Sequence, residues 1–469
     1  MDTKSLLDPK LAPGPRFRAL ADRICAAVED GALAPGVKLP PVRDLAYRLG
    51  IGPGAVARAY RLGIERGVLE ATVWRGTFVR TTLAERPGPR FAADGLFDDL
   101  GRDAIDLRGN RAVEVGQDVE IGRALTRLLA RWDHRPPLAG YRRREQDPEA
   151  IESMAGWLRS FGVPAEAERL LVTVGAQAGV VAAMTTLVRG GSGVVLTAAT
   201  LHAGLKDGAA ARGVRLEPVA SDGEGLMPEA LDAACARLKP DAVQLSATLH
   251  NPTLETMGPG RRHAIAAVAR AHDIAVVEDD VYGALMDPAP ESFAAIAPER
   301  TWYVASFSKC VAAGVRAGLL LTPPGRTTAA LRSYQALAHQ TPWLVKALAA
   351  EMVDGGEAAV VRERVLGETR ARAAEAARLL GPYGARTHPA ASFVHLPLCA
   401  PWEPGEFVAA AAAARVLLPP ATTKRVGRPR GSSGRSARAA AVPREALSEA
   451  LVRLARLLAE GPRTPTLAT

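Results

Sequence analysis

The chain has 469 residues, 48% of them hydrophobic and 23% charged, which is typical of a soluble globular protein of two or three domains. Its net charge of +9 permits an anionic partner without naming one. The four cysteines are scattered, which argues against a disulfide framework or a metal site and favours a reducing, cytoplasmic compartment. The first residues lack the apolar run of a signal peptide, and no uncharged apolar run approaches ~18 residues, so we expect no membrane span.

Residues 1–80 are predicted to form a small basic module, with 13 Lys and Arg against 8 Asp and Glu. Apolar residues at helical spacing predict a first helix over 16–30. A second helix, over 42–49, is opened by prolines, and a third over 54–66 follows a tight glycine turn. Residues 68–79 predict two short strands. A helix, a helix–turn–helix and a hairpin in this order predict a winged helix.

This module resembles the DNA-binding domain of GntR-type bacterial regulators through LAPGVKLPPVRDLAYRLGI, AVARAYRLGIERGVL and WRGTFV. The resemblance implies that Arg43 contacts the DNA backbone. It also implies that the third helix enters the major groove, which makes Arg58 and Arg61 candidates for phosphate or base contacts, and Arg75 is a further candidate. The family usually has Ser-Arg and Thr where residues 52–55 read Gly-Pro-Gly-Ala, which leaves base readout open. The alternative is a winged helix used for protein contacts.

Residues 81–104 are predicted to form a linker. Two prolines and several charges over 81–90 interrupt any apolar periodicity, and the one apolar cluster falls between Phe91 and Phe97. A tether of this length can reach far enough for the first domain to lie against another subunit.

Residues 105–469 are predicted to form an α/β domain, because apolar strand-like runs alternate with alanine-rich helices. This alternation is typical of a mainly parallel, doubly wound sheet, in which ligands bind at the C-terminal ends of the strands. The predicted strands are 170–174, 193–197, 214–219, 242–246, 275–278, 301–306 and 318–321.

Lys309 follows one of these strands, with Ser306 and Ser308 before it and Arg316 after it. A desolvated lysine with a lowered pKa suits a Schiff-base amine, and the hydroxyls and Arg316 can hold a phosphate. Pyridoxal 5′-phosphate (PLP) requires both features. Taken alone, such a lysine is more often an exposed residue in an αβ loop.

Other polar residues fall at further strand ends. Asp279 can pair with the pyridine nitrogen of PLP, and Asn251 and Tyr282 can both hydrogen-bond its phenolate oxygen. The backbone N–H groups of Ala176 and Gln177, between a strand and a helix, can face a phosphate. Four such elements in this order favour one PLP site over separate loops.

Residues 105–460 resemble fold-type I aminotransferases through TVGAQ, HNPT, EDDVYG and SFSKCVAAGVRAG. The resemblance implies that Lys309 forms the internal aldimine and that Tyr141 reaches the phosphate of a partner subunit. It also implies a smaller C-terminal subdomain. The family's Gly after Asn-Pro-Thr is replaced by Leu254, and Leu201 stands where an aromatic usually stacks on the ring, with His202 as a possible substitute.

The family's arginine for the substrate carboxylate lies shortly before the final helix, which is predicted here over 445–458. Arg435 fits this position best, and Arg438 is the alternative. Both lie in a segment, 424–444, with seven Lys and Arg and no acid. This segment is a solvated loop, a site for a multiply acidic effector, or a minor-groove hook at Gly427–Arg430.

A GntR-type winged helix fused to an aminotransferase-like domain resembles the MocR-type transcriptional regulators. The resemblance implies a cytoplasmic, PLP-dependent regulator of operator DNA, usually a domain-swapped homodimer, that senses PLP or an amine or amino acid through an aldimine at Lys309. The alternative is a working aminotransferase with an appended DNA-binding module. A third possibility is a DNA-binding protein whose second domain serves only for dimerisation, but such a scaffold would need none of the PLP-binding residues.

Overall fold

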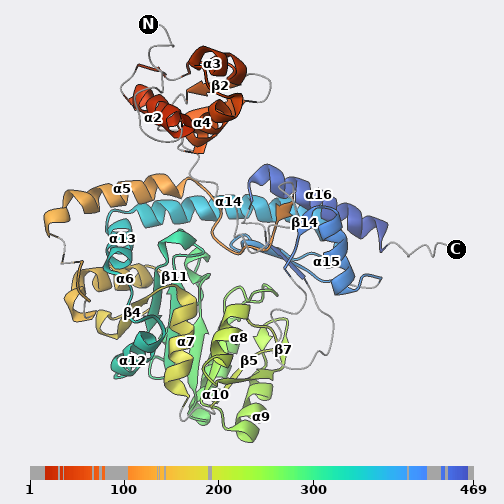
Figure 1. The fold of residues 1–469 in the computed structure, drawn as a ribbon. Coiled ribbons are helices and arrows are strands. Elements are labelled where there is room, and N and C mark those ends of the chain that lie inside the picture. Colours follow the sequence, from red (N-terminus) through yellow and green to blue (C-terminus); the bar gives the residue numbers. More distant parts are fainter. Residues whose placement is uncertain are drawn as a thin grey trace. The chain divides into compact units, whose positions relative to one another are not determined.

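The structure is a computed structural model, and it divides into two compact units, Met1–Leu100 and Gly101–Thr469 (Figure 1). The linker predicted over 81–104 lies outside the described residues except for residue 104. The described residues are 16–29, 32–34, 36–65, 68–72, 76–79, 104–134, 136, 138–141, 144–188, 193–398, 401–419, 435–438 and 442–462.

The first unit is the predicted winged helix. Its elements are α2 (Arg16–Glu29), α3 (Val42–Leu49), α4 (Pro53–Glu65), β1 (Leu69–Thr72) and β2 (Gly76–Val79). Leu20 and Ile24 of α2 pack with Val56 of α4 and Leu69 of β1 in a buried core. Gly50 ends α3 with φ +62°, a left-handed conformation that glycine adopts without strain and that turns the chain toward α4.

The second unit is built on a seven-stranded sheet, as predicted. The strand order is β4-β12-β11-β10-β9-β5-β6, and all strands are parallel except β12, which runs antiparallel to both of its neighbours. The strands are β4 (Leu170–Thr173), β5 (Val194–Ala198), β6 (Arg215–Val219), β9 (Ala242–Leu245), β10 (Ala275–Asp279), β11 (Thr301–Ser306) and β12 (Gly318–Leu321).

Helices cover both faces of this sheet, because alternate strand residues point to opposite sides. Val277 and Val304 pack on one face with residues of α7, α8 and α12, while Val276 packs on the other with α9 and α10. Residues of α6 and α13 also pack on that second face. These helices are α6 (Pro148–Arg159), α7 (Ala176–Leu187), α8 (Ala203–Ala210), α9 (Pro228–Leu238), α10 (Pro259–Ala271), α12 (Thr327–Ala338) and α13 (Trp343–Asp354).

A smaller C-terminal subdomain has its own core. The long helix α14 (Glu357–Leu380) contributes residues to this core and also to the core beside α13 (Figure 1). Strand β3 pairs with β14, and β13 pairs with β15. The other strands and α-helices of this subdomain are β3 (Ile105–Asp106), β13 (Phe393–Leu396), α15 (Pro404–Ala413), β14 (Val416–Leu417), β15 (Arg435–Arg438) and α16 (Arg444–Glu460). Outside it lie the short elements β7 (Ser221–Asp222), β8 (Gly225–Leu226) and α11 (Phe293–Ile296).

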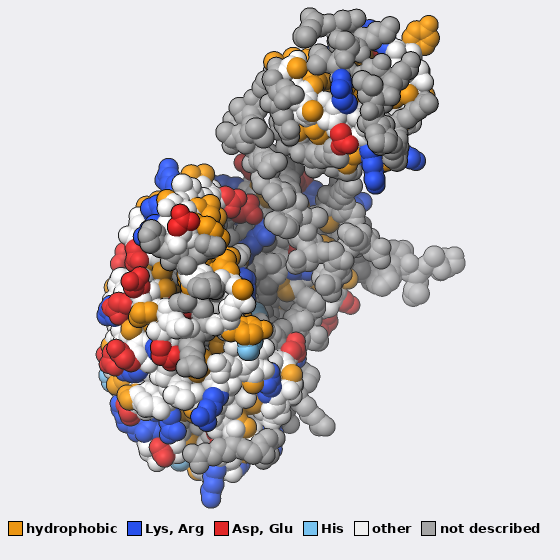
Figure 2. All heavy atoms as spheres, turned by 60° about the vertical axis from the view of Figure 1, so that its left-hand side comes forward, with side chains coloured by type: hydrophobic (Ala, Val, Ile, Leu, Met, Phe, Trp, Pro, Cys, Tyr) orange, Lys and Arg blue, Asp and Glu red, His pale blue; other side chains and the backbone are white. Residues whose placement is uncertain are grey.

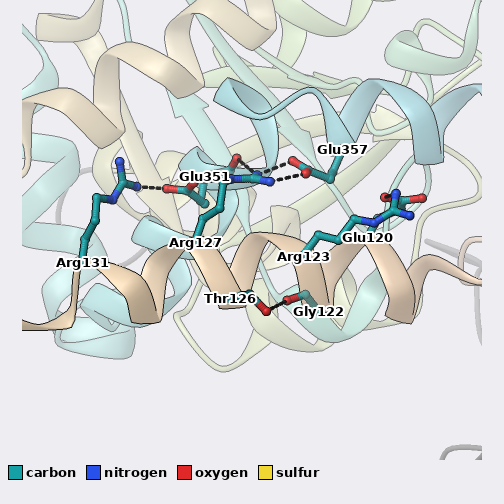
Figure 3. A network of polar contacts seen from close by, with 8 residues as sticks. All are labelled: Glu120, Gly122, Arg123, Thr126, Arg127, Arg131, Glu351 and Glu357. Carbon is teal, nitrogen blue, oxygen red and sulfur yellow. Dashed lines mark hydrogen bonds and ion pairs between the residues drawn. The ribbon is translucent and has the colours of Figure 1, made fainter. Parts of the chain in front are cut away.

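Helix α5 (Gln117–Ala130) is fastened to α13 and α14 by charged side chains (Figure 3). Arg127 donates to Glu351 of α13 at 2.7 Å and to both carboxylate oxygens of Glu357 of α14 at 2.5 Å. Arg131 also pairs with Glu351. Both glutamates are nearly buried, so this network holds α5 against α13 and α14.

Hydrophobic side chains on α5 remain exposed within this single chain. Val119 and Leu129 are each 58% exposed, and Leu125 is 38% exposed. Figure 2, which brings this side of the molecule forward, shows hydrophobic side chains among charged ones. None of the helices in the described ranges is both long enough and apolar enough to span a membrane.

Candidate functional site

A cavity of about 210 Å³ lies at the C-terminal ends of β5, β9, β10 and β11. Ligands of open α/β sheets bind at this edge. Most of the residues predicted from the sequence to hold a cofactor line it together: Ala176, Gln177, Asn251, Asp279, Tyr282, Ser306, Ser308, Lys309 and Arg316.

Lys309 sits beside a residue that the sequence analysis missed. Its Nζ donates a hydrogen bond to the backbone carbonyl oxygen of Asn110. The Asn110 side chain in turn donates from Nδ2 to the Tyr282 hydroxyl at 2.9 Å and accepts from Ser392 Oγ at 3.0 Å. Asn110 therefore joins the lysine, the tyrosine and the C-terminal part of the chain at one point.

Asp279 ends β10 and points into the cavity. Its Oδ1 is buried and has no hydrogen-bond partner within the described part of the chain. Burial raises the pKa of Asp279 to about 7; the Asp280 carboxylate adds to this shift and the Lys309 ammonium opposes it. A buried acceptor without a donor suits the N–H of a protonated pyridine ring.

The neighbouring acids point to the opposite face of the sheet, as strand alternation requires. Arg262 pairs with Glu278 at 3.2 Å, and Tyr303 donates to Asp280 at 2.8 Å. Burial raises the pKa of Glu278 to about 8. Only Asp279 of the three consecutive acids lines the cavity.

An anion cradle lies at the start of α7. Gly175 precedes the helix with φ +89°, and the Arg316 guanidinium, itself donating to the carbonyl oxygen of Val174 at 2.9 Å, packs against it. Gly318 approaches so closely that a Cβ there would lie 2.3 Å from the Gly175 carbonyl carbon. The N–H groups of the first helical turn, which have no acceptor within the helix, and the Arg316 cation together suit a phosphate.

Further polar residues of the wall were missed. Thr197, Gln244, Ser246 and His250 line the cavity, and Thr197 Oγ1 donates to Gln244 Oε1 at 2.9 Å. Two of them could have been found from the sequence, because Thr197 and Gln244 interrupt the otherwise apolar runs 194–198 and 242–245. Asn110 left none, because only the tertiary fold brings it to Lys309.

Two of the positions that depart from the family pattern also lie at this site. Leu201 and His202 both line the cavity, with Leu201 buried. Leu254, at the family's glycine, has φ +66°, a conformation that glycine adopts more readily.

Tyr141, Arg435 and Arg438 are the other residues predicted for the cofactor and its effector. Tyr141 does not line the cavity; it is 81% exposed, and its ring meets the His339 ring edge-on at 4.4 Å. Arg435 and Arg438 form strand β15, but their side chains lie outside the described part.

Three of the predicted DNA-binding arginines are described. Arg43 on α3 and Arg58 and Arg61 on α4 are exposed. The Arg58 guanidinium lies 6.0 Å from the centre of the Phe17 ring. Arg75 lies outside the described residues.

Two family models match the chain. "Aminotransferase class I and II" matches residues 123–454, and "Bacterial regulatory proteins, gntR family" matches residues 17–79. The HTH-type transcriptional regulator TauR of Rhodobacter capsulatus is 30% identical over 363 residues, covering 71% of this chain and 73% of that protein. The probable rhizopine catabolism regulatory protein MocR of Rhizobium meliloti is 25% identical over 368 residues, covering 73% and 72%. The match to another regulator, YdeF of Bacillus subtilis, spans 66% of that protein's length, slightly under two thirds.

A similar solved structure is that of the α-aminoadipate aminotransferase LysN from Thermus thermophilus, with a TM-score of 0.66 and 22% identity over 77% of this chain and 94% of that one. This likeness concerns the fold. The aminotransferase class I and II match indicates PLP as the cofactor. The unpartnered Asp279 oxygen, the Lys309 amine and the anion cradle fit its ring nitrogen, aldehyde and phosphate.

Proposed function

We propose that this chain binds operator DNA and senses PLP, or an amine or amino-acid effector, through a Schiff base at Lys309. The chain belongs to the bacterial transcriptional regulators that join a GntR-type helix–turn–helix domain to an aminotransferase class I and II domain. The observation that carries the proposal is the meeting of Lys309, Asp279 and the anion cradle in one cavity. The proposed domains are 1–80 for DNA, 81–104 as linker and 105–469 for the effector, in a cytoplasmic protein.

Each cavity residue has a task in this proposal. PLP, when bound, supplies an aldehyde and an electron-withdrawing ring. Lys309 would offer the amine that pairs with this aldehyde. To do so, its Nζ would give up the hydrogen bond to the Asn110 carbonyl oxygen. Asp279 accepts from the ring nitrogen, which keeps that nitrogen protonated.

The other groups orient the cofactor. Tyr282 and Asn251 direct polar groups at the ring oxygen, and the Tyr282 hydroxyl is held in place by Asn110. The phosphate is held by residues at the rim of the cavity: Ala176, Gln177, Ser306, Ser308 and Arg316.

The first unit carries the DNA-binding part of the proposed function. Arg43, Arg58 and Arg61 are exposed on the two helices of the helix–turn–helix, and we propose that they contact phosphates or bases. Arg75 joins them from the wing in this proposal. Gly52 and Gly54, at the start of α4, carry no side chain, so base readout would depend on the arginines farther along the helix.

A homodimer, domain-swapped, completes the proposal. The exposed Val119, Leu125 and Leu129 offer an apolar surface for a second copy. Tyr141, exposed and away from its own chain's cavity, is free to reach the phosphate in the partner. Arg435, or Arg438, would pair with the carboxylate of an amino-acid effector.

The test is an absorption spectrum of the purified full-length protein with PLP, followed by titration with amines and amino acids. A visible band that is absent from Lys309→Ala and that shifts with one compound supports the sensor and identifies its effector. No band in the parent protein, or the same band in Lys309→Ala, would contradict it. The matched control is Lys206→Ala, on α8 and outside the cavity lining.

The alternative function is an aminotransferase with an appended DNA-binding module. One observation supports this alternative: the residues that such an enzyme would need lie around one cavity, namely Lys309, Asp279, Asn251 and Tyr282. Under this alternative, an amine would abolish the visible band and a keto acid would restore it. A sensor would give a shifted band that persists.

A further inference from the structure

Gln244 is a polar residue in the interior of a buried strand. It is 1% exposed in β9, between the buried apolar residues Val243 and Leu245. Thr197 Oγ1, also fully buried, donates to Gln244 Oε1 at 2.9 Å, which fixes the orientation of the amide. Gln244 Nε2 is then a buried donor with no hydrogen-bond partner in the described part of the chain. Burying an amide donor unpaired is costly, so a partner is expected from a ligand or a ligand-bound state.

The register of the sheet places Gln244 on the same face as Asp279. Gln244 lies opposite Val277 on the adjacent strand β10, and Asp279 lies two residues beyond Val277. Residues two apart on a strand point to the same side, so both side chains face the α7 side of the sheet. Both line the same cavity.

The two side chains are complementary in their unmet hydrogen bonds. Asp279 Oδ1 is a buried acceptor without a donor, and Gln244 Nε2 is a buried donor without an acceptor. A carboxylate has two oxygens and can therefore accept from a ring N–H and from an amide at once. A donor at the second oxygen favours the ionised carboxylate, which is the form that the ring N–H needs.

We propose that Gln244 is a positioning residue for Asp279: when a ligand with a protonated ring nitrogen is bound, Gln244 Nε2 donates to the Asp279 carboxylate, directly or through one water molecule. Thr197 holds the amide in the required orientation. This inference rests on the proposed function, because it needs a pyridine ring at Asp279. It goes beyond that function by giving Gln244 and Thr197 a task in holding the carboxylate that meets the ring nitrogen.

The test compares two ligands in the full-length protein. Dissociation constants for PLP and for its 1-deaza analogue, which has carbon in place of the ring nitrogen, are measured by fluorescence titration in wild type and Gln244→Leu. Gln244→Met, unbranched and similar in length, serves as a second variant should leucine disturb folding, which circular dichroism checks. We expect both variants to lose about tenfold in PLP affinity, as for a hydrogen bond to a charged group. Their affinity for the 1-deaza analogue should equal that of wild type.

The other outcomes separate this inference from the proposed function. An equal loss for both ligands would show that Gln244 only packs against the ring, and an unchanged PLP affinity would show that it has no role; either overturns the inference and leaves the proposed function intact. If wild type binds neither ligand, the proposed function fails, and this inference with it. Thr197→Val is expected to give a smaller loss, again for PLP alone.

Discussion

Lys309 Nζ donates a hydrogen bond to the backbone carbonyl oxygen of Asn110, which lies 199 residues earlier in the chain. The same short segment begins in the C-terminal subdomain, where Ile105 pairs with Val416, and reaches the site where the Ala112 N–H donates to the Ser308 carbonyl oxygen at 3.0 Å. Lys309 therefore contacts the segment that links the cavity to the subdomain.

Asn110→Ala removes the side-chain bonds to Tyr282 and Ser392 but keeps the backbone carbonyl that Lys309 uses. Because Tyr282 then loses its support, we expect PLP affinity to fall about 3- to 10-fold, the effect of one ordinary hydrogen bond. Absorbance titration measures it. Ser392→Ala, which spares the Tyr282 contact, should have a smaller effect. An unchanged affinity in Asn110→Ala would show that Tyr282 is held without it.

Asp279 makes the stability of the cofactor-free protein depend on pH. Its pKa rises from 3.8 to about 7 on folding, so the folded state binds this proton more tightly than the unfolded state does. The contribution of this proton to the free energy of unfolding is fully present below pH 3.8 and is lost as pH rises to about 7. Asp279→Asn removes that loss, so the cofactor-free variant should be more stable than wild type at pH 8, by up to roughly 4 kcal/mol, and similar below pH 4. Urea unfolding at both pH values measures this, and a difference that is equal at both would contradict the assignment.

Gly318→Ala should damage the anion cradle. The new Cβ would lie 2.3 Å from the Gly175 carbonyl carbon, which is backbone and cannot swing away. We expect a loss of about 1–3 kcal/mol in stability, as for overpacking, and weaker binding of PLP. Thermal unfolding and absorbance titration measure the two effects. Gly314→Ala, where the added Cβ meets nothing within 4 Å, is the matched control and should change neither.

Arg43→Ala tests the DNA-binding half. Removing one phosphate contact should weaken binding to all DNA sequences alike and reduce the magnitude of the salt-dependence slope by about 1. Fluorescence anisotropy at several salt concentrations gives the slope. Arg23→Ala, an exposed arginine on α2 outside the helix–turn–helix, is the control. Equal behaviour of the two variants would remove Arg43 from the proposed interface.

Arg127→Met should loosen α5. Glu351 and Glu357 would stay nearly buried without their main cation, so the melting temperature should fall at pH 7. The Arg127 guanidinium holds the pKa of Glu357 below its usual range, so this contribution is present above the unfolded pKa and is lost as pH falls through the folded value. Scanning calorimetry should show a gap from wild type that closes at low pH. Arg123→Met should change the melting temperature less, because its buried partner Glu120 keeps a second cation, Arg364, at 2.9 Å.

The two domain types, the mainly parallel sheet and the positions of Lys309, Asp279 and Asn251 at strand ends could be predicted from the sequence alone. These features are local: hydrophobic periodicity sets each strand, and parallel strands bring their C-terminal ends to one edge of the sheet. Strand β12 was predicted as a strand, but only the fold shows that it runs antiparallel and so places Gly318 against Gly175.

The hydrogen-bond partners and neighbours of these residues could be found only in the folded chain. Asn110 reaches Lys309 and Tyr282 from the start of the second unit, and the register between neighbouring strands places Gln244 on the same face of the sheet as Asp279. Neither relationship has a sequence signal, because hydrogen bonds between distant segments depend on how the subdomain and the sheet pack. The free energy that fixes them comes from the buried cores around the site, and most residues of those cores do not line the cavity.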